Sequence, residues 1–532
     1  MARSHRSRWQ ETDTNVAPEV DVVFLLGGVL ERWEGGVVIQ DVQGCLRAVR
    51  ARDARFDGWF YFAVTTTGIY CRPSCSSAPP KARNLRFFAS AAAAQQGGFR
   101  ACKRCRPDAS PGSPHWNQRA DVVARAMRLI ADGVVDRVGV TGLAAQLGYS
   151  TRQVERQVRA ELGAGPGAIA RAQRAQTART LIETTSLPMT EIAAAAGFAS
   201  IRAFNDTLKD VYASSPSELR RRNAPHDPEV AETPAPSLQL RLPVRAPFAT
   251  APLFDHLGRE AVAGVEAWSN GVYRRTVRLP RGVGVLSLRP FEDHVSCRLT
   301  LQDLRDLPQA IHRCRRLLDL DADPVAIDDV LATDPPLEPL ITQRPGLRVP
   351  QTVDPQELAL RVALGQHLSD EANSAHCARL VRVHGDRLPE GFDPEGELTH
   401  LFPTAESLSM CAPHVRALPA PRGLVMDVLI TALCDGEIEL GLGADRERAR
   451  AQLAAVPGLG ASARELIAMR CLGDPDAFPP DEPSLRAAAH RAGVAVGSAL
   501  NDRSLRWAPW RAYAAEHLWA SAASHRQAAR SQ

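Results

Sequence analysis

Apolar positions recur at helical spacing between residues 118 and 222, which predicts a succession of amphipathic helices. One such run comprises Val122, Val123, Ala126, Leu129 and Ile130. Residues 141–162 and 189–211 share one internal pattern: a short helix, a turn that contains Gly, and a longer helix that a Ser can cap. A long helix over 167–184 joins them. The repeated pattern predicts two helix-turn-helix units in an all-helical domain.

The pattern changes beyond this domain. Residues 223–243 are rich in Pro and poor in apolar side chains, which is typical of a linker. From Tyr273 to Leu301 apolar and polar residues alternate as in half-buried strands, and a helix follows. We therefore expect a small α/β domain with an antiparallel sheet over 244–350. From about 354 the pattern is helical again, and the Gly-rich turn at 456–460 predicts a helix-hairpin-helix.

The charge distribution indicates a partner. The 532 residues carry a formal net charge of +4. Residues 71–106 contain eight Lys or Arg and no Asp or Glu, and residues 118–222 contain 15 basic and 10 acidic residues. A basic surface in the first half of the chain favours double-stranded DNA as a partner. The sequence has no run of about 20 apolar residues, so we expect no membrane-spanning helix. The seven cysteines outside residues 71–105 are scattered and unpaired, which is typical of buried thiols in a reducing cytoplasm.

Four of the 11 cysteines form two close pairs within the basic stretch, and 26 residues separate the pairs. They are Cys71, Cys75, Cys102 and Cys105. This spacing allows all four thiols to close on one ion, as in Cys₄ zinc sites. A purely structural zinc ribbon is one alternative. A disulfide pair is another, although the chain shows no secretory signal that would favour it.

The residues around these cysteines resemble the N-terminal domain of the Ada alkylation-response proteins. The resemblance covers about residues 42–112 and lies in the segments 56–60, 65–75 and 98–108. It implies that Cys71 is the nucleophile that removes a methyl group from a methylphosphotriester in damaged DNA. Attack on carbon requires a thiolate, and zinc keeps a thiol ionised at neutral pH. The other ligands of Zn²⁺ would be Cys75, Cys102 and Cys105, and the candidates for DNA contacts are Arg72, Arg100 and Arg104.

Residues 118–222 resemble the AraC-type DNA-binding domains, down to the closing segment 215–220. That fold places two recognition helices in successive major grooves. The resemblance implies that residues 150–157 and 200–207 face the bases. The best candidates for base contacts are Arg152, Gln153, Arg156, Arg202 and Asn205. For each single Arg, a solvated or phosphate-contacting side chain is the alternative. Such a regulator would bind promoter DNA and work with RNA polymerase.

Residues 244–522 resemble the AlkA family of 3-methyladenine DNA glycosylases. The resemblance rests on the hairpin and on the segments 364–369, 478–482 and 506–519. It implies that an alkylated base is flipped into a pocket and released, while a carboxylate stabilises the cationic sugar. Gly458 and Gly460 would present backbone N–H groups to a DNA phosphate, and His367 would be the wedge in the opened duplex.

The glycosylase pattern is altered at two places. The family has Gly-x-Trp-Thr-Ala after the hairpin, where this chain has Gly-Ala-Ser-Ala-Arg from Gly460 onward. The essential Asp aligns best with Glu482, and Asp481 precedes it. A Glu side chain is one methylene longer, and a misplacement near 1 Å costs on the order of 100-fold in rate. Three aromatic residues form either the walls of a base pocket or hydrophobic core: Trp507, Trp510 and Trp519.

We therefore expect a multidomain chain. Its fold class is a small α/β Cys₄-zinc domain, an all-α double helix-turn-helix domain, then an α+β antiparallel-sheet domain joined to a helical helix-hairpin-helix domain. The expected boundaries are an N-terminal extension at 1–41, the Ada-like domain at 42–112, the AraC-type domain at 118–222, the linker at 223–243, the α/β domain at 244–350 and the glycosylase-like domain at 351–522.

Two main functions remain open at this point. One is an alkylation-response protein that transfers a methyl group to Cys71, activates transcription and excises alkylated bases such as 3-methyladenine. The other is a regulator whose impaired glycosylase module only binds DNA. A transcription factor with a structural zinc is a third. The state of Cys71 separates the third from the others, and the carboxylates Asp481 and Glu482 separate the first two.

Overall fold

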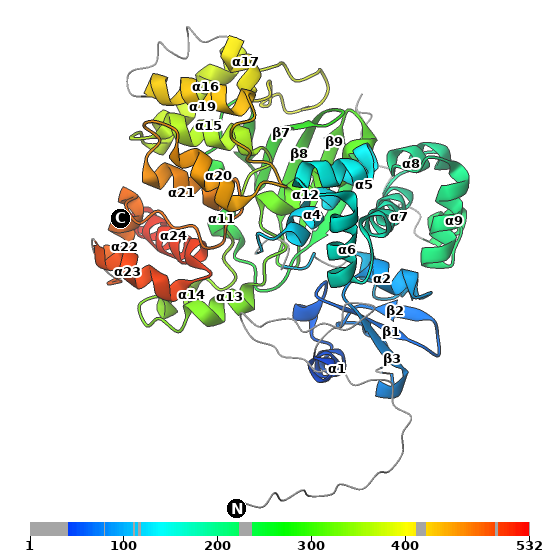
Figure 1. Ribbon diagram of the computed structural model, residues 1–532. Coiled ribbons are helices and arrows are strands. Elements are labelled where there is room, and N and C mark those ends of the chain that lie inside the picture. Colours follow the sequence, from blue (N-terminus) through cyan, green and yellow to red (C-terminus); the bar gives the residue numbers. More distant parts are fainter. Residues whose placement is uncertain are drawn as a thin grey trace, which may run out of the picture.

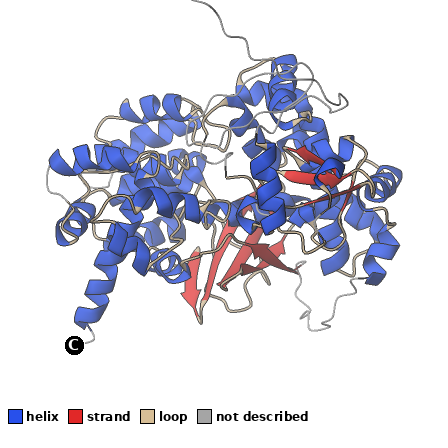
Figure 2. Ribbon diagram, turned by 90° about the horizontal axis from the view of Figure 1, so that it is seen from below, coloured by secondary structure: helices blue, strands red, loops and turns tan. Residues whose placement is uncertain are grey.

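The computed structural model describes residues 41–78, 80–109, 112–114, 119–222, 237–410, 422–494 and 498–530. Apart from Asp41, the expected extension at 1–41 lies outside the described residues, and so do residues 223–236 of the expected linker. Four groups of elements follow one another along the chain (Figure 1). The strands of the larger sheet lie between two helical masses (Figure 2).

The first group is a small α/β unit on a four-stranded sheet of order β3-β1-β2-β4. β1 pairs antiparallel with β2 and with β3, whereas β2 and β4 run parallel. Gly68, at φ +66°, closes the turn between β1 and β2. The elements are α1 (Val42–Ala51), η1 (Ala54–Phe56), β1 (Tyr61–Val64), β2 (Ile69–Cys71), η2 (Ala82–Asn84), β3 (Leu85–Phe88), α2 (Ala91–Gln96), β4 (Arg100–Ala101) and η3 (Pro107–Ala109).

The second group is helical, as its periodicity predicted. Ser150 and Ser200 cap the two longer helices of the repeated units, which confirms the capping expected of them. The helix that leads into the first unit is broken at Gly139, whose φ is +70°. The elements are α4 (Val122–Ala131), α5 (Val134–Leu147), α6 (Thr151–Leu162), α7 (Pro166–Thr184), α8 (Met189–Ala195), α9 (Ile201–Tyr212) and α10 (Pro216–Arg222).

The third group carries an antiparallel five-stranded sheet of order β5-β9-β8-β7-β6. Its first strand covers the last seven residues of the expected linker at 223–243, so the boundary at 244 is wrong. Leu238, Leu240 and Leu242 are buried and alternate with exposed polar residues, which is the pattern of an edge strand on a core. The elements are β5 (Ser237–Pro243), α11 (Thr250–Arg259), β6 (Glu266–Ser269), β7 (Val272–Leu279), β8 (Gly282–Pro290), β9 (His294–Leu301), η4 (Leu304–Asp306), α12 (Leu307–Leu317), α13 (Pro324–Leu331) and α14 (Glu338–Gln343).

The fourth group is a helical unit, and the expected hairpin lies between α20 and α21. No helix among the described residues has the length and apolarity needed to cross a membrane. The elements are α15 (Pro355–Gly365), α16 (Asp370–His384), α17 (Ala405–Met410), α19 (Arg422–Cys434), α20 (Arg446–Ala454), α21 (Ala461–Arg470), α22 (Pro483–Arg491), α23 (Ser498–Ser504), η5 (Leu505–Trp507) and α24 (Arg511–Arg530).

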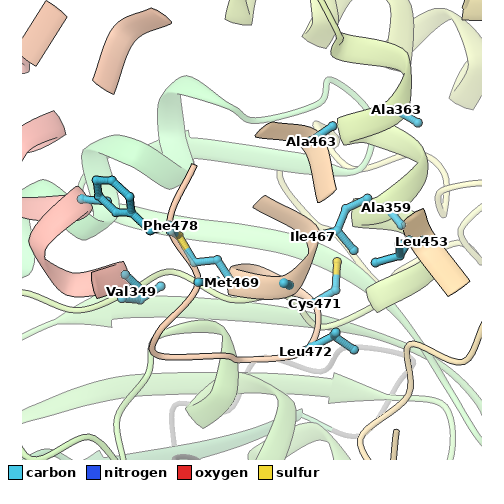
Figure 3. Packing of buried hydrophobic residues seen from close by; sticks show 14 of the residues in the cluster. Val349, Ala359, Ala363, Leu453, Ala463, Ile467, Met469, Cys471, Leu472 and Phe478 are labelled. Carbon is cyan, nitrogen blue, oxygen red and sulfur yellow. The ribbon is translucent and has the colours of Figure 1, made fainter. Parts of the chain in front are cut away.

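Two hydrophobic clusters explain how these groups hold together. The largest cluster supports the hairpin, because Ile467 of α21 packs with Ala359 of α15 and Leu453 of α20 (Figure 3). A second cluster crosses the chain and contains Tyr70 of the small unit, Leu181 of α7 and residues of the five-stranded sheet. The first three groups therefore share one continuous core.

Candidate metal centre and DNA-binding surfaces

The four cysteines meet where two parallel strands end. Tyr70 in β2 is in register with Ala101 in β4, so the residues that follow them, Cys71 and Cys102, lie side by side. Tight turns after each strand bring back the second cysteine of each pair. The ligand atoms of all four residues lie within 4.8 Å of one another. Four sulfurs bound tetrahedrally to zinc at about 2.3 Å lie roughly 3.8 Å apart, so the donor set fits Zn²⁺.

Charge at this centre also favours a cation. All four cysteines are buried within a shell of aromatic residues. The Cys71 thiol donates to Cys102 and the other sulfurs, which raises the pKa of Cys71, whereas hydrogen bonds with Cys105 and Cys71 lower the pKa of Cys102 to about 6. Four thiolates so close together would repel one another, so without a cation some of the thiols stay protonated. A divalent cation offsets this repulsion and holds all four as thiolates.

Asp57 holds the turn between the first two cysteines, a role that the sequence pattern did not assign. Its carboxylate accepts hydrogen bonds from the backbone N–H of Ser74 at 3.0 Å and from the Ser74 hydroxyl at 2.6 Å. It also pairs with Arg72 at 3.1 Å. Burial raises the pKa of the Asp57 carboxyl, and the bonds from Ser74 oppose this. The only sequence signal was the position of Asp57 in the segment that carries the Ada resemblance.

The three arginines expected to contact DNA near this centre are placed differently. Arg100 and Arg104 are exposed and lie within two residues of Cys102 in the sequence, so they are available to a phosphate. Arg72 is half-buried and tied to Asp57, so it orders the metal-binding turn as well.

The small unit is docked on the helical unit directly beside the metal centre. Arg106, next to Cys105, pairs with Glu183 of α7. Asp108 accepts hydrogen bonds from Arg179 of α7 at 3.3 Å and from the Tyr212 hydroxyl of α9 at 3.2 Å. The centre is therefore linked to the joining helix α7 by two of these contacts and to the second helix-turn-helix unit by one, through Tyr212 of α9.

The two longer helices of the repeated units, α6 and α9, expose the residues expected to read DNA. Their apolar faces are buried through Val154 and Val158 in α6 and Phe204 and Leu208 in α9. The expected DNA-contacting residues are all exposed: Arg152, Gln153, Arg156, Arg202 and Asn205. The side chain of Gln153 also accepts a hydrogen bond from the backbone N–H of Ser150, completing a capping box.

The hairpin at 456–460 has the geometry that its glycines predicted, with one difference. Gly458 has φ +80°, and a Cβ there would lie 2.7 Å from Val425. Gly460 opens α21, but its N–H donates to the side-chain oxygen of Gln366 at 2.8 Å. Next to Gln366, the expected wedge His367 is exposed and has φ +63°, a strained conformation for a residue with a side chain. The hairpin and the wedge loop thus lie together.

The two candidate carboxylates differ sharply in their surroundings. Glu482 caps α22 and accepts hydrogen bonds from the backbone N–H groups of Ser484 and Leu485 at 3.0 and 2.6 Å. It also accepts one from the indole N–H of Trp519 at 3.2 Å. Asp481 is exposed and lines a cavity of about 500 Å³ at the N-terminus of α21, together with Ser462.

Only one of the three tryptophans lies beside a candidate carboxylate. Trp507 is 1% exposed and bonds to Asp334 at 2.8 Å, and Trp510 is 3% exposed, so both are core residues. Trp519 is half-buried, with its indole on Glu482 and its ring 5.8 Å from the Arg470 guanidinium.

A buried ionic cluster behind Trp519 was not foreseen from the sequence. Arg470 donates to Glu516 at 3.1 Å and lies 2.5 Å from the ring of His256. Burial raises the pKa of Glu516 to about 7. Since these residues come from three distant segments, no local spacing could have revealed the cluster.

Comparisons with known proteins agree with this division of the chain. Residues 44–108 match the metal binding domain of Ada, residues 143–222 a helix-turn-helix domain, and residues 239–354 the AlkA N-terminal domain. With the buried Cys₄ site, the first match identifies the cofactor as Zn²⁺.

Three relatives cover different parts of the chain. The "Probable bifunctional transcriptional activator/DNA repair enzyme AlkA" of Mycobacterium tuberculosis is 55% identical over 480 residues, which are 90% of this chain and 96% of the relative. The "Bifunctional transcriptional activator/DNA repair enzyme Ada" of Escherichia coli is 39% identical over 133 residues, 25% of this chain and 36% of the relative. The "DNA-3-methyladenine glycosylase 2" of Escherichia coli is 27% identical over 274 residues, 50% of this chain and 92% of the relative. The chain belongs to the family of AlkA-type bifunctional transcriptional activators and DNA repair enzymes, in which an Ada-like zinc and helix-turn-helix region is joined to an AlkA-like glycosylase region.

Proposed function

We propose that this protein repairs and senses alkylated DNA: it takes a methyl group from a methylphosphotriester onto Cys71, activates transcription, and excises alkylated bases such as 3-methyladenine. The observation that carries the proposal is the buried Cys₄ centre in an Ada-like frame, docked on an AraC-like domain. The relatives named as bifunctional activators and repair enzymes support it.

The chemistry of the first step follows from the donor set. Zinc, when bound, keeps the sulfurs ionised at neutral pH. The Cys71 sulfur then attacks the methyl carbon, an S–C bond forms, and the C–O bond to the phosphorus-bound oxygen breaks. The electron pair stays on that oxygen, which restores the anionic phosphodiester, and Cys71 becomes a neutral thioether. No other reactant is needed. A thioether is a poor methyl donor and a phosphodiester a weak nucleophile, so the methyl group stays on the sulfur and each molecule performs the step once.

The assignment of the acceptor to Cys71 rests on its position in the motif, since the four cysteines are similarly buried. The exposed residues Arg100 and Arg104 would draw the DNA backbone to this unit. Exposed residues of α6 and α9 would read the promoter, and RNA polymerase would be the partner in activation. Because its substrate is chromosomal DNA and its relatives are bacterial, we place its action in the cytoplasm.

Intact mass before and after incubation with methylated DNA tests this function. We expect the wild type to gain one methyl group, and peptide mapping to find it on Cys71. The Cys71→Ser variant should gain none, because a hydroxyl is a far weaker nucleophile and zinc ligand than a thiolate. Zinc content of the same samples is the control for loss of the fold. A methyl group on another cysteine, or no gain at all, would overturn the assignment.

The base-excision step has its own support and its own competitor. Alkylated bases such as 3-methyladenine are cationic, so their glycosidic bond is weakened before any enzyme acts, and one oriented carboxylate can stabilise the sugar cation. Glu482 with Trp519 supplies such a carboxylate. The competing function is a regulator whose glycosylase module only binds DNA. It is favoured by one observation, that the Glu482 carboxylate is already engaged by its own helix.

A further inference from the structure

We call the described residues up to 222 the regulator half and those from 237 onward the glycosylase half. One face of α4, in the regulator half, contacts the turn at 441–445 that precedes the hairpin. Arg125, Arg128 and Leu129 lie three and four residues apart and so project from the same side of the helix. Arg125 Nε donates to the carbonyl oxygen of Gly443 at 2.7 Å, and Arg128 Nε donates to that of Leu442 at 2.9 Å. Both arginines are 8% exposed.

The turn is shaped to receive this helix. A Cβ on Gly443 would lie 2.7 Å from the end of the Leu129 side chain, so any side chain there would force the buried Leu129 to move. The side chain of Leu442 packs against the hydrophobic cluster formed by α4, α5 and α6. A residue of the glycosylase half thus completes the core of the regulator half.

The contacts continue from the turn into the hairpin. Arg125 pairs with Asp445 at 3.4 Å, and Asp445 caps α20 by accepting a bond from the N–H of Arg448 at 3.1 Å. Arg446, the first residue of α20, donates to the Gly473 carbonyl at 2.6 Å and so ties in the chain beyond α21. Helix α20 ends at Ala454, just before the turn at 456–460. A displacement at its start therefore moves the hairpin.

We propose that Arg125 and Arg128 are positioning residues for base excision: the regulator half holds the hairpin where it meets the DNA phosphate. The inference rests on the proposed function only in that the hairpin binds DNA during base release. It makes the helix-turn-helix unit a structural part of the glycosylase, so that excision depends on a domain that contributes no group to the reaction.

The test compares the double variant Arg125→Met, Arg128→Met with wild type in the full chain. Arg174→Met is the matched control, because Arg174 pairs with Asp136 inside the regulator half and lies away from the turn. Hydrogen exchange of peptides from 442–470 should speed up on the order of ten-fold in the double variant, with peptides of the zinc unit unchanged. The KM for alkylated DNA should rise by about the same factor while kcat is maintained. A purely structural loss would instead lower the active fraction, and so kcat, without changing KM.

Two further variants keep the result decisive. Gly443→Ala leaves both arginines in place and should loosen the same segment from the other side, also if the double variant fails to fold. Arg125→Lys, combined with Arg128→Met, keeps the charge and one hydrogen-bond donor. Peptides 442–470 should therefore exchange more slowly in this variant than in the double Met variant. Equal exchange in wild type, the double variant and Gly443→Ala would overturn the inference. A wild type that releases no base would refute the proposed excision instead, and the exchange result would still decide whether α4 positions the hairpin.

Discussion

Glu482 combines two tasks at the residue scale. Its longer side chain reaches back to the N–H groups of Ser484 and Leu485, and this capping takes up the extra methylene relative to Asp. The Trp519 indole donates to Oε2, the same oxygen that accepts from Leu485. The Ser484 hydroxyl donates to the carboxylate as well, at 2.7 Å. A carboxylate held by four donors keeps one orientation, which electrostatic stabilisation of a sugar cation requires. Asp481 is close in sequence but exposed at the cavity.

We predict that the double variant Asp481→Asn, Glu482→Gln loses release of 3-methyladenine from alkylated DNA. The rate should fall by at least about 100-fold, to the uncatalysed background, because the negative charge beside the sugar cation is removed. The variant Asp435→Asn, Glu437→Gln is the control, since it removes two exposed carboxylates from the same half. If wild type and the first variant share the background rate, the module only binds DNA and the regulator interpretation holds.

At the element scale, the longer helices of the two repeated units, α6 and α9, are built in the same way. Each begins at a Ser cap, buries a strip of apolar residues and leaves its polar strip in solvent. Because the Gln153 side chain also serves the capping box, its orientation is restrained from the start of α6. The Arg202 side chain takes no part in the cap of α9. It is 91% exposed and paired with Asp206 at 3.8 Å.

We predict that Arg202→Ala weakens binding to the protein's own promoter by roughly ten-fold or more, as expected for the loss of one base contact. Arg221→Ala on α10 removes the same charge from another exposed site and is the control. Gel-shift titration at fixed salt measures both. An equal, small loss in the two variants would mean that Arg202 contacts only the phosphate backbone.

At the scale of the whole molecule, the metal centre and the second recognition helix belong to one body. Asp108, three residues beyond Cys105, accepts the Tyr212 hydroxyl of α9. Methyl transfer removes one negative charge from the zinc centre, and this lowers its repulsion of DNA phosphates. Because the small unit cannot turn independently of α9, the gain at the centre adds to binding through the helices.

We predict that the methylated protein binds promoter DNA on the order of ten-fold more tightly than the unmethylated protein at low salt, and that the difference shrinks as salt rises. Gel-shift titrations over a salt series measure this. Cys71→Ser, treated with the same alkylated DNA, is the control because it lacks the proposed acceptor thiol. Equal affinities of the two forms would rule out an electrostatic switch.

The sequence by itself determined the four cysteines of the zinc centre, the two Ser-capped helices of the repeated units and the hairpin. Each depends on local spacing: Cys71 and Cys75 share one turn, Ser150 precedes its helix directly, and Gly458 supplies the positive φ that the hairpin requires. The strand at 237–243 also had a local signal in its alternating leucines, which the Pro-rich stretch before it obscured.

Only the tertiary structure decided which side chains meet across the chain. Asp57 reaches Ser74, Arg470 reaches Glu516 and His256, and Arg125 reaches Gly443 across more than 300 residues. It also separated Trp519 from the core residues Trp507 and Trp510. Burial and long-range pairing depend on how the elements pack, and a contact between distant residues leaves no periodicity in the chain. For that reason the contacts of α4 with the turn before the hairpin are visible only in the folded molecule.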